Sequence, residues 1–168
     1  MTVTIRYAEP ADATELVELA RAVATEEEGW LITAGDWRSP SEERRYLRSV
    51  RRYPHAAVLV ADDEGHVVGR LSTARDPHPA SAHVADVGLM VARSHRRHGV
   101  GRALMEAAED WARAEGIRKL ELHVFPHNEP AIALYRSLGY REEGLRLRHY
   151  RRDGQYLDAI LMAKEVSE

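Results

Sequence analysis

The sequence predicts a single α+β domain, a mixed sheet with helices on both of its faces. The order of the predicted elements is β-α-α-β-β-β-α-β-α-β-β, in which helices are few and most strands follow one another directly. Turn-forming residues at 62–65 and 151–154 each separate two strand-like runs, as in hairpins. No repeat, low-complexity tract or linker interrupts residues 1–168, a length typical of one domain. This order differs from that of a doubly wound dinucleotide-binding domain.

The N-terminal third is predicted as a strand followed by two helices. Residues 3–7 alternate as a strand does, and Pro10 with Asp12 opens a helix that ends in the run 26–29. The apolar positions of this helix keep helical spacing: Leu16, Leu19, Ala20 and Val23. Residues 39–41 have the chemistry of a second helix start, and that helix is expected to run to about residue 53.

The middle of the chain is predicted as three strands and a long helix. Runs 56–61 and 67–73 form a hairpin, and 83–91 is a further strand after a proline-rich loop. The helix begins near residue 100 and ends at Gly116, which suits a position just after a helix end. Its apolar residues follow the helical pattern: Val100, Ala103, Leu104, Ala107, Ala108 and Trp111.

The C-terminal third is predicted as a strand, a short helix and a hairpin. Residues 117–125 form the strand, which Pro126 closes. The apolar residues of the helix are Ala131, Leu134, Tyr135 and Leu138, with Gly139 just past its end. Runs 140–150 and 155–164 pair around a turn that contains Asp-Gly, a strong hairpin signal.

Composition excludes several classes of function. The formal net charge of −3 gives no global reason to expect nucleic acid, and no apolar run approaches the roughly 20 residues of a membrane span. Glu9 and Asp12 follow Met1 with no apolar run between them, so we expect no signal peptide and a cytoplasmic location. Cysteine is absent, which excludes disulfides and an acyl-cysteine intermediate. A homodimer is left open.

The segment 96–101, Arg-Arg-His-Gly-Val-Gly, has the features of an anion site. It joins a strand to a helix, whose first turn leaves backbone N–H groups unpaired at its positive end. Gly99 and Gly101 allow a phosphate close to the backbone, and Arg96, Arg97 and Arg102 add positive charge. The segment lacks the Gly-Lys-Ser/Thr of a P-loop and the third glycine of the dinucleotide fingerprint. An ordinary helix entrance with two loop glycines is the alternative.

At this point the sequence resembles the GNAT N-acetyltransferases. Arg96, Gly99 and Gly101 match their signature of Arg or Gln, two residues, Gly, one residue, then Gly or Ala. A second block, 128–135 followed by 138–140, matches at the usual distance. The resemblance covers essentially the whole chain and implies the acyl-CoA N-acyltransferase fold, with a mostly antiparallel sheet of about seven strands and about four helices.

The resemblance implies acetyl-CoA as the acyl donor and no metal. The strands at 83–91 and 117–125 would separate and admit the pantetheine arm, with Gly88 as a bulge that opens the edge and the Met90 N–H stabilising the oxyanion. The cofactor-binding residues expected are Leu89, Met90, Val91, Arg96, Arg97, His98, Gly99, Val100, Gly101, Arg102, Asn128 and Tyr135.

Two residues are the catalytic candidates that the resemblance implies. Tyr135 would protonate the departing thiolate of coenzyme A, although its position in an apolar helical stripe equally suits a core residue. Asp86 would act as general base, usually through water, and a solvated strand end is the equal alternative. His123 is a weaker candidate base. Asn128 also suits a helix cap.

The acceptor is predicted to be the primary amine of a small molecule. The C-terminal segment 148–158 resembles that of bacterial family members that acetylate free amino acids or similar amines, and the runner-up is a protein N-terminus or lysine. Candidate acceptor-binding residues are Glu28, Trp30, Arg75, His123 and Tyr150. A non-catalytic sensor of coenzyme A is the alternative of another class. The histidine pairs 95/98 and 123/127 lack a known zinc spacing on a helix.

Overall fold

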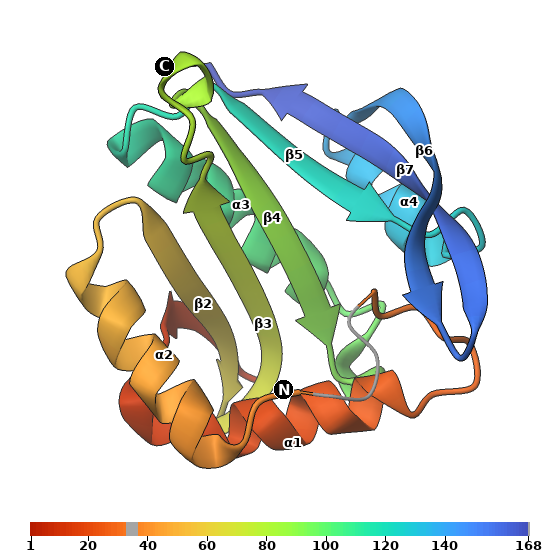
Figure 1. Ribbon diagram of the computed structural model, residues 1–168. Coiled ribbons are helices and arrows are strands. Elements are labelled where there is room, and N and C mark those ends of the chain that lie inside the picture. Colours follow the sequence, from red (N-terminus) through yellow and green to blue (C-terminus); the bar gives the residue numbers. More distant parts are fainter. Residues whose placement is uncertain (33–36, 168) are drawn as a thin grey trace.

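The computed structural model describes residues 1–32 and 37–167, which form one seven-stranded sheet and four α-helices (Figure 1). The strands are β1 (Val3–Tyr7), β2 (Ala56–Asp63), β3 (His66–Arg75), β4 (Val84–Val91), β5 (Lys119–Val124), β6 (Arg141–Arg152) and β7 (Gln155–Glu165). The helices are α1 (Ala13–Ala24), α2 (Pro40–Arg52), α3 (Val100–Ala114) and α4 (Glu129–Ser137). Three short 3-10 turns are η1 (Pro10–Asp12), η2 (Pro79–Ser81) and η3 (Arg93–His95).

The sheet has the order β1-β2-β3-β4-β5-β7-β6. All neighbouring strands are antiparallel except β4 and β5, which run parallel. A parallel pair needs a crossover, and α3 supplies it between these two strands. The fold class and the order of elements predicted from the sequence are confirmed.

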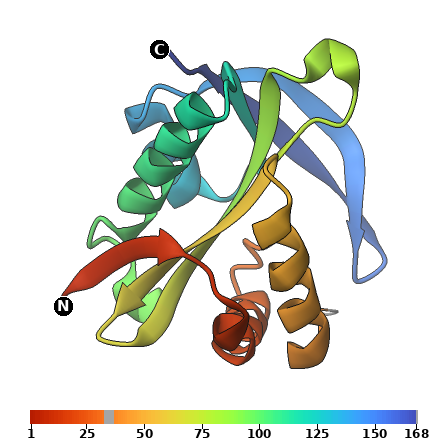
Figure 2. The same cartoon turned by 90° about the vertical axis from the view of Figure 1, so that its left-hand side faces the viewer.

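Two helical layers cover opposite faces of the sheet (Figures 1 and 2). On one face, Leu104 and Met105 of α3 are fully buried in a core that includes residues of β2, β3 and β5. On the other, Leu16 of α1 and Leu47 of α2 pack against Val58 and neighbouring residues of β2. The prediction of helices on both faces is therefore confirmed, and each face has its own apolar core.

Local signals in the sequence account for several boundaries. Ser39 begins α2 with a reciprocal capping box to Glu42, so this helix starts where the sequence predicts. The β6–β7 hairpin turns at Asp153 and Gly154, whose φ values of 50° and 78° fit the left-handed turn that matches strand twist. The expected helix starting at Pro10 instead begins with η1, and the α-helix follows at Ala13.

The parallel strands β4 and β5 separate after a short paired stretch. Pairing runs only from Val84 with Lys119 to Asp86 with Glu121, although both strands continue beyond it. The register of β4 with β3 passes through Gly88 without a shift, so the predicted bulge there is wrong. The edge of β4 is exposed because β5 diverges from it, which creates an opening in the middle of the sheet.

Candidate active site

Two pockets lie at this opening, and we name each after one element of its wall. The α4 pocket, of about 520 Å³, is formed by α4, the start of α3 and the end of β4. The β5 pocket, of about 420 Å³, is formed by β5 with parts of β3, β4 and β6. Both are lined by Trp30, Leu31, Leu89, Met90, Asn128 and Tyr135. The two pockets therefore meet at the separated strands.

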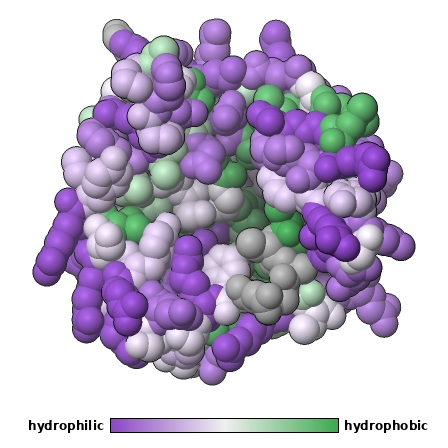
Figure 3. All heavy atoms as spheres, in the orientation of Figure 1, coloured by the Kyte–Doolittle hydropathy of each residue, from purple (hydrophilic) through white to green (hydrophobic). Residues whose placement is uncertain are grey.

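The two pockets succeed one another along β4. Asp86, Val87 and Gly88 line only the β5 pocket, Leu89 and Met90 line both pockets, and Val91 lines only the α4 pocket. In the orientation that looks onto α1 and α2, pale and green residues fill the centre of the molecular face and purple ones surround them (Figure 3).

The start of α3 has the features of an anion-binding site and lies in the wall of the α4 pocket. Gly99 caps the helix start and has a φ of 82°. Its carbonyl accepts the first helical hydrogen bond, from the Ala103 N–H at 3.0 Å. The preceding N–H groups of this turn have no intrahelical acceptor and point out of its positive end. Arg97 and Arg102 are exposed and line the same wall. This arrangement suits a phosphate group.

Arg96 lies in that wall, but its guanidinium is held by the protein. It makes two hydrogen bonds to the Glu26 carboxylate, at 2.7 and 2.9 Å, and a third to the Val91 carbonyl at 3.0 Å. It also lies over the ring of Trp30. This side chain fixes the end of β4 against the end of α1, and a direct contact of Arg96 with pyrophosphate, which stays a prediction, would compete with Glu26.

Two other residues of the segment do not line either pocket. His98 is exposed, and the Val100 side chain is buried in the core beneath α3. The contribution of Val100 is limited to its backbone N–H in the first helical turn. Gly101 does line the α4 pocket, and a Cβ placed there would lie 3.1 Å from Leu134 Cδ2 of α4.

Alternate residues of β4 have backbone N–H groups that do not bond to β3. Asp76 N–H donates to the Val84 carbonyl at one end, and Ala92 N–H donates to the Val68 carbonyl at the other. The register between these bonds has no shift, so the even-numbered residues of β4 direct their backbone groups to β3. The N–H of Met90 therefore faces β3, and the expected oxyanion donor is corrected to Leu89, whose backbone faces the opening.

Tyr135 and Asn128 lie where the two pockets meet. The Tyr135 side chain is only 7 % exposed, and burial raises its pKa well above the usual value. Its phenol is therefore protonated at neutral pH and can donate a proton. The Asn128 side chain accepts a hydrogen bond from Ala131 N–H at 3.3 Å, which confirms the predicted helix cap.

Asp86 lies in the β5 pocket, where its carboxylate accepts a hydrogen bond from Ala74 N–H at 3.1 Å. The residue is exposed to solvent through the pocket, although the pocket walls partly desolvate its carboxylate. This partial desolvation raises the pKa of Asp86, because burial disfavours the charged form. A carboxylate with a raised pKa is a stronger base than a solvated one.

His123 and Tyr150 form a pair on the other side of the β5 pocket. Their Nδ1 and hydroxyl atoms are 2.6 Å apart. Burial lowers the pKa of His123, and the charges of Arg146 and His149 lower it further. Burial raises the pKa of Tyr150. The imidazole is therefore neutral at neutral pH and can accept a proton.

Two residues expected at the acceptor site line neither pocket. Glu28 pairs with Arg93 at 2.9 Å, and Glu26 pairs with Arg96, so these two carboxylates are engaged with arginines and not open to a ligand. Arg75 donates to the Glu115 carbonyl at 2.7 Å, at the C-terminal end of α3. Both expectations are corrected. Trp30, by contrast, lines both pockets.

Five polar or aromatic residues of the β5 pocket were not found from the sequence: Trp37, Arg70, Ser72, Glu121 and Arg146. Arg70 interrupts an apolar strand at a position that faces α1 and α2, and a lone cation there is the signal that could have found it. Arg152 contributes indirectly, because its guanidinium donates to the Gly29 and Leu31 carbonyls at 2.9 and 2.8 Å. It holds the segment after α1 against the β6–β7 hairpin.

The described residues offer no cluster of three or more His, Asp or Glu side chains arranged for a metal ion. His95 is 2.9 Å from an Asp63 carboxylate oxygen, and His127 is 2.9 Å from the Glu28 carbonyl. No helix in the described part of the chain has both the length and the apolar character of a membrane span.

A helix start suited to phosphate, beside a separated strand edge and joined to a second polar pocket, is the arrangement expected of an acyl-CoA-dependent transferase. Residues 13–140 match the model of the Acetyltransferase (GNAT) family. The chain belongs to this family and is an acetyl-CoA-dependent N-acetyltransferase.

Individual relatives agree with this assignment. The chain is 34% identical over 166 residues to the L-amino acid N-acetyltransferase AaaT of Escherichia coli (strain K12), covering 96% of this chain and 97% of that protein. A GNAT acetyltransferase structure from Streptococcus pneumoniae has a TM-score of 0.88 and 29% identity, covering 99% of this chain and all of the other. An acetyltransferase structure from Salmonella typhimurium with acetyl-CoA has a TM-score of 0.86 and 22% identity, covering 100% and 96%, and shows the shared fold.

Proposed function

We propose that the protein transfers the acetyl group of acetyl-CoA to the primary amine of a small molecule, in particular a free amino acid or a related amine. The acceptor amine attacks directly while donor and acceptor are both bound. The observation that carries the proposal is the meeting of two pockets at Tyr135, beside the place where β4 and β5 separate. One pocket has the chemistry of a diphosphate site, and the other contains a base.

The α4 pocket is the proposed donor site. Acetyl-CoA supplies an activated acyl thioester. The N–H groups of the first turn of α3, with Arg97 and Arg102, would hold its pyrophosphate, because they combine a positive helix end with two exposed cations. The backbone of Leu89 and Val91 faces the opening and would hold the pantetheine amides as a neighbouring strand would. The Leu89 N–H would also stabilise the oxyanion.

Tyr135 is the proposed general acid. Its hydroxyl would donate a proton to the departing sulfur, for which a phenol with a raised pKa is in the required protonated state. Asn128 would contact the donor in addition to capping α4, because it lines the α4 pocket.

Asp86 is the proposed general base, and His123 is the alternative. An amine with a pKa of about 10 is neutral in only about one molecule per thousand at pH 7, so removal of its proton needs assistance. Asp86 has a raised pKa and lies in the β5 pocket, where it would act through water. His123 lies in the same pocket and is neutral, so both satisfy the basic requirement.

A free amino acid is favoured as acceptor for two reasons. The β5 pocket has the size of a small-molecule site, at about 420 Å³. The relative from Escherichia coli is named for L-amino acids. A protein N-terminus or lysine is the second candidate, and a non-catalytic sensor is the alternative of another class. We also propose a cytoplasmic location and a homodimer. The exposed side chains of Leu145 and Leu147 on the outer strand β6 favour the homodimer.

The experiment is an assay of thiol release from acetyl-CoA with free L-amino acids and, in parallel, short peptides and lysine-containing peptides. Turnover on free amino acids with little on peptides is the expected result. Preference for peptides would favour the second candidate. Thermal stabilisation by acetyl-CoA without turnover on any amine would favour the sensor. Light scattering of the same preparation gives the mass that tests the homodimer.

A further inference from the structure

Arg70 is a buried cation at one end of the β5 pocket. It lies on β3, is only 4 % exposed and contributes to the pocket wall. Its Nη2 is 3.5 Å from Oε1 of Glu43, a fully buried residue of α2. Burial lowers the pKa of Arg70 and Glu43 opposes that effect, so the guanidinium stays protonated. A buried arginine next to a small-molecule pocket is costly unless its N–H groups find acceptors.

Two buried N–H donors at this end of the pocket have no acceptor among the described residues. One is Nε of Arg70 and the other is Nε1 of Trp37. The Arg70 guanidinium carbon lies 5.2 Å from the centre of a Trp37 ring, so the two residues are in contact. Both line the β5 pocket. An unpaired donor in the interior destabilises the protein, so two neighbouring ones indicate an acceptor that a ligand brings.

The ionised side chains grouped around Arg70 carry a net positive charge, whereas the carboxylates of Asp86 and Glu121 line the pocket elsewhere on β4 and β5. Glu43 is shared by two arginines, because its Oε2 accepts a hydrogen bond from Arg38 at 2.8 Å. The set of Arg38, Glu43 and Arg70 therefore holds two positive charges and one negative charge. An anionic group would balance it, and a planar guanidinium is suited to a carboxylate.

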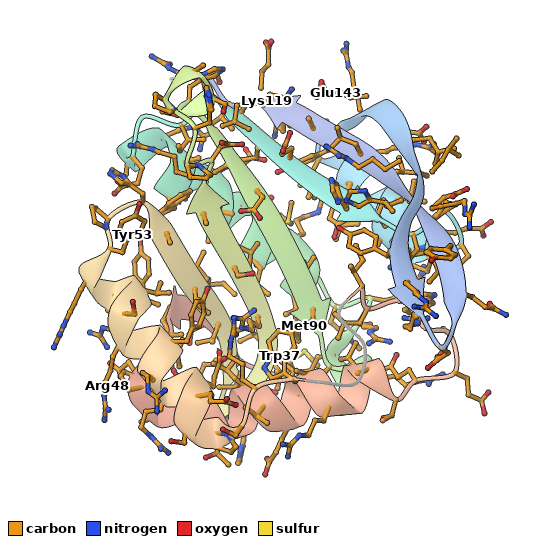
Figure 4. The ribbon with its side chains drawn as sticks, in the orientation of Figure 1. Trp37, Arg48, Tyr53, Met90, Lys119 and Glu143 are labelled. Atoms are coloured by element: carbon orange, nitrogen blue, oxygen red, sulfur yellow. The ribbon has the colours of Figure 1, made fainter. Side chains whose placement is uncertain are left out.

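Arg70 also lies beside a residue of β4 that lines both pockets. It is the register partner of Met90, and Ser72 is the partner of Gly88 in the next row. Figure 4 shows Met90 and Trp37 close to each other at the end of β3 and β4 near α1. A group bound at Arg70 thus lies beside the part of β4 where both pockets meet.

The pocket floor between Arg70 and Asp86 is kept open by Gly88. A Cβ there would lie 3.1 Å from Ser72 Oγ. Asp86 lies two residues before Gly88, about 7 Å along the strand. An α-amino acid whose carboxylate contacts Arg70 would direct its amine toward Gly88 and Asp86.

We propose that Arg70 and Trp37 bind the α-carboxylate of the acceptor, which makes free α-amino acids the substrate class. This inference rests on the proposed function. In a polypeptide the carboxyl of the N-terminal residue is an amide and carries no charge. Arg70 therefore favours binding of free amino acids over protein N-termini, because an uncharged amide does not balance the net positive charge of Arg38, Glu43 and Arg70.

The experiment compares each of two acceptors, L-phenylalanine and L-methionine, with its carboxamide. The amide removes the charge and keeps the shape, and its amine is less basic. Without a carboxylate contact the amide would be the better acceptor. For the wild-type enzyme we expect kcat/KM to favour the free acid. Arg70→Gln should raise KM for the acid by roughly 10- to 100-fold while leaving KM for the amide and for acetyl-CoA within about twofold.

Further variants separate recognition from folding. Arg70→Lys keeps the charge and should lose less than Arg70→Gln, and Trp37→Phe should raise KM for the acid only, by a few-fold. Arg70→Gln with Glu43→Gln removes both buried charges, which protects the fold if the single variant unfolds. Arg48→Gln, which changes an exposed arginine of α2, is the control with wild-type kinetics.

The outcomes distinguish this inference from the proposed function. If the wild-type enzyme uses acid and amide equally, or if Arg70→Gln raises both KM values alike, Arg70 only holds α2 to the sheet and the inference fails while acetylation of small amines stands. If no free amino acid or amide is acetylated by the wild-type enzyme, the proposed function itself fails.

Discussion

The two pockets that meet at Tyr135 are built in different ways. The α4 pocket takes its main polar groups from the backbone of one continuous segment, the end of β4 and the first turn of α3. The β5 pocket takes its polar groups from side chains on four strands that are distant in sequence: Arg70, Asp86, His123 and Tyr150 among them. A backbone site is insensitive to most side-chain changes, whereas a side-chain site changes with each substitution.

This difference separates what the family shares from what one member selects. Backbone N–H groups at a helix start recognise phosphate in any chain that folds in this way. The charges of the β5 pocket can be replaced without disturbing that segment, because they belong to side chains outside it. Donor use thus follows from the fold, while acceptor choice follows from individual side chains.

The largest effect is expected for Tyr135, which lies where the two pockets meet. Tyr135→Phe removes the hydroxyl and keeps the ring that packs in the core. We expect kcat to fall by roughly 100- to 10,000-fold, the range for loss of a general acid, with both KM values little changed. Steady-state kinetics with each substrate varied in turn measures this. Wild-type kcat would remove Tyr135 from proton transfer and would leave it as a core residue.

A second effect belongs to the β5 pocket alone. Burial raises the pKa of Asp86, so its carboxylate becomes a base only as the pH rises through that raised value, and kcat/KM should increase over the same range. Asp86→Asn should remove this acidic limb and lower kcat/KM by roughly 100-fold. KM for acetyl-CoA should not change.

His123→Gln is the matched comparison for the identity of the base. If His123 is the base, its lowered pKa predicts that kcat/KM rises with pH in a range below about 6.5, the ordinary pKa of histidine. If Asp86 is the base, His123→Gln keeps the pH profile of the wild-type enzyme. A profile flattened by His123→Gln and unaltered by Asp86→Asn would transfer the role to His123.

The sequence predicts the fold and the α4 pocket well because their signals are local. Hairpin turns, the Ser39 cap and the glycines of the first turn of α3 each act within a few residues. Acceptor residues were predicted less well for the opposite reason. Arg75 and Glu28 have suitable chemistry, but their hydrogen bonds to Glu115 and Arg93 depend on packing between distant segments.

The roles of Arg96 and Met90 show the same limit at finer scale. A signature arginine beside a phosphate-binding turn suggests a direct contact, yet Glu26, which lies 70 residues earlier, takes both of its terminal nitrogens. The direction of the Met90 N–H depends on the register of β4 against β3, which no local pattern encodes. Local patterns identify such residues, but their partners come from the tertiary structure.

The smallest effect is expected in the α4 pocket, where the backbone carries the site. Gly101→Val adds a Cβ that would lie 3.1 Å from Leu134 Cδ2, so α4 must shift slightly and the approach to the first turn of α3 narrows. We expect the Kd for acetyl-CoA to rise about tenfold by calorimetry, with KM for the acceptor unchanged, since lost hydrogen bonds to charged groups are worth about 1.5 kcal/mol. Gly144→Ala, in β6 with open space around it, is the control. Because Glu26 already engages Arg96, Arg96→Gln should weaken acetyl-CoA binding less than Gly101→Val does. The reverse order would return the pyrophosphate contact to the Arg96 side chain and make the donor site depend on a side chain, as the acceptor site does.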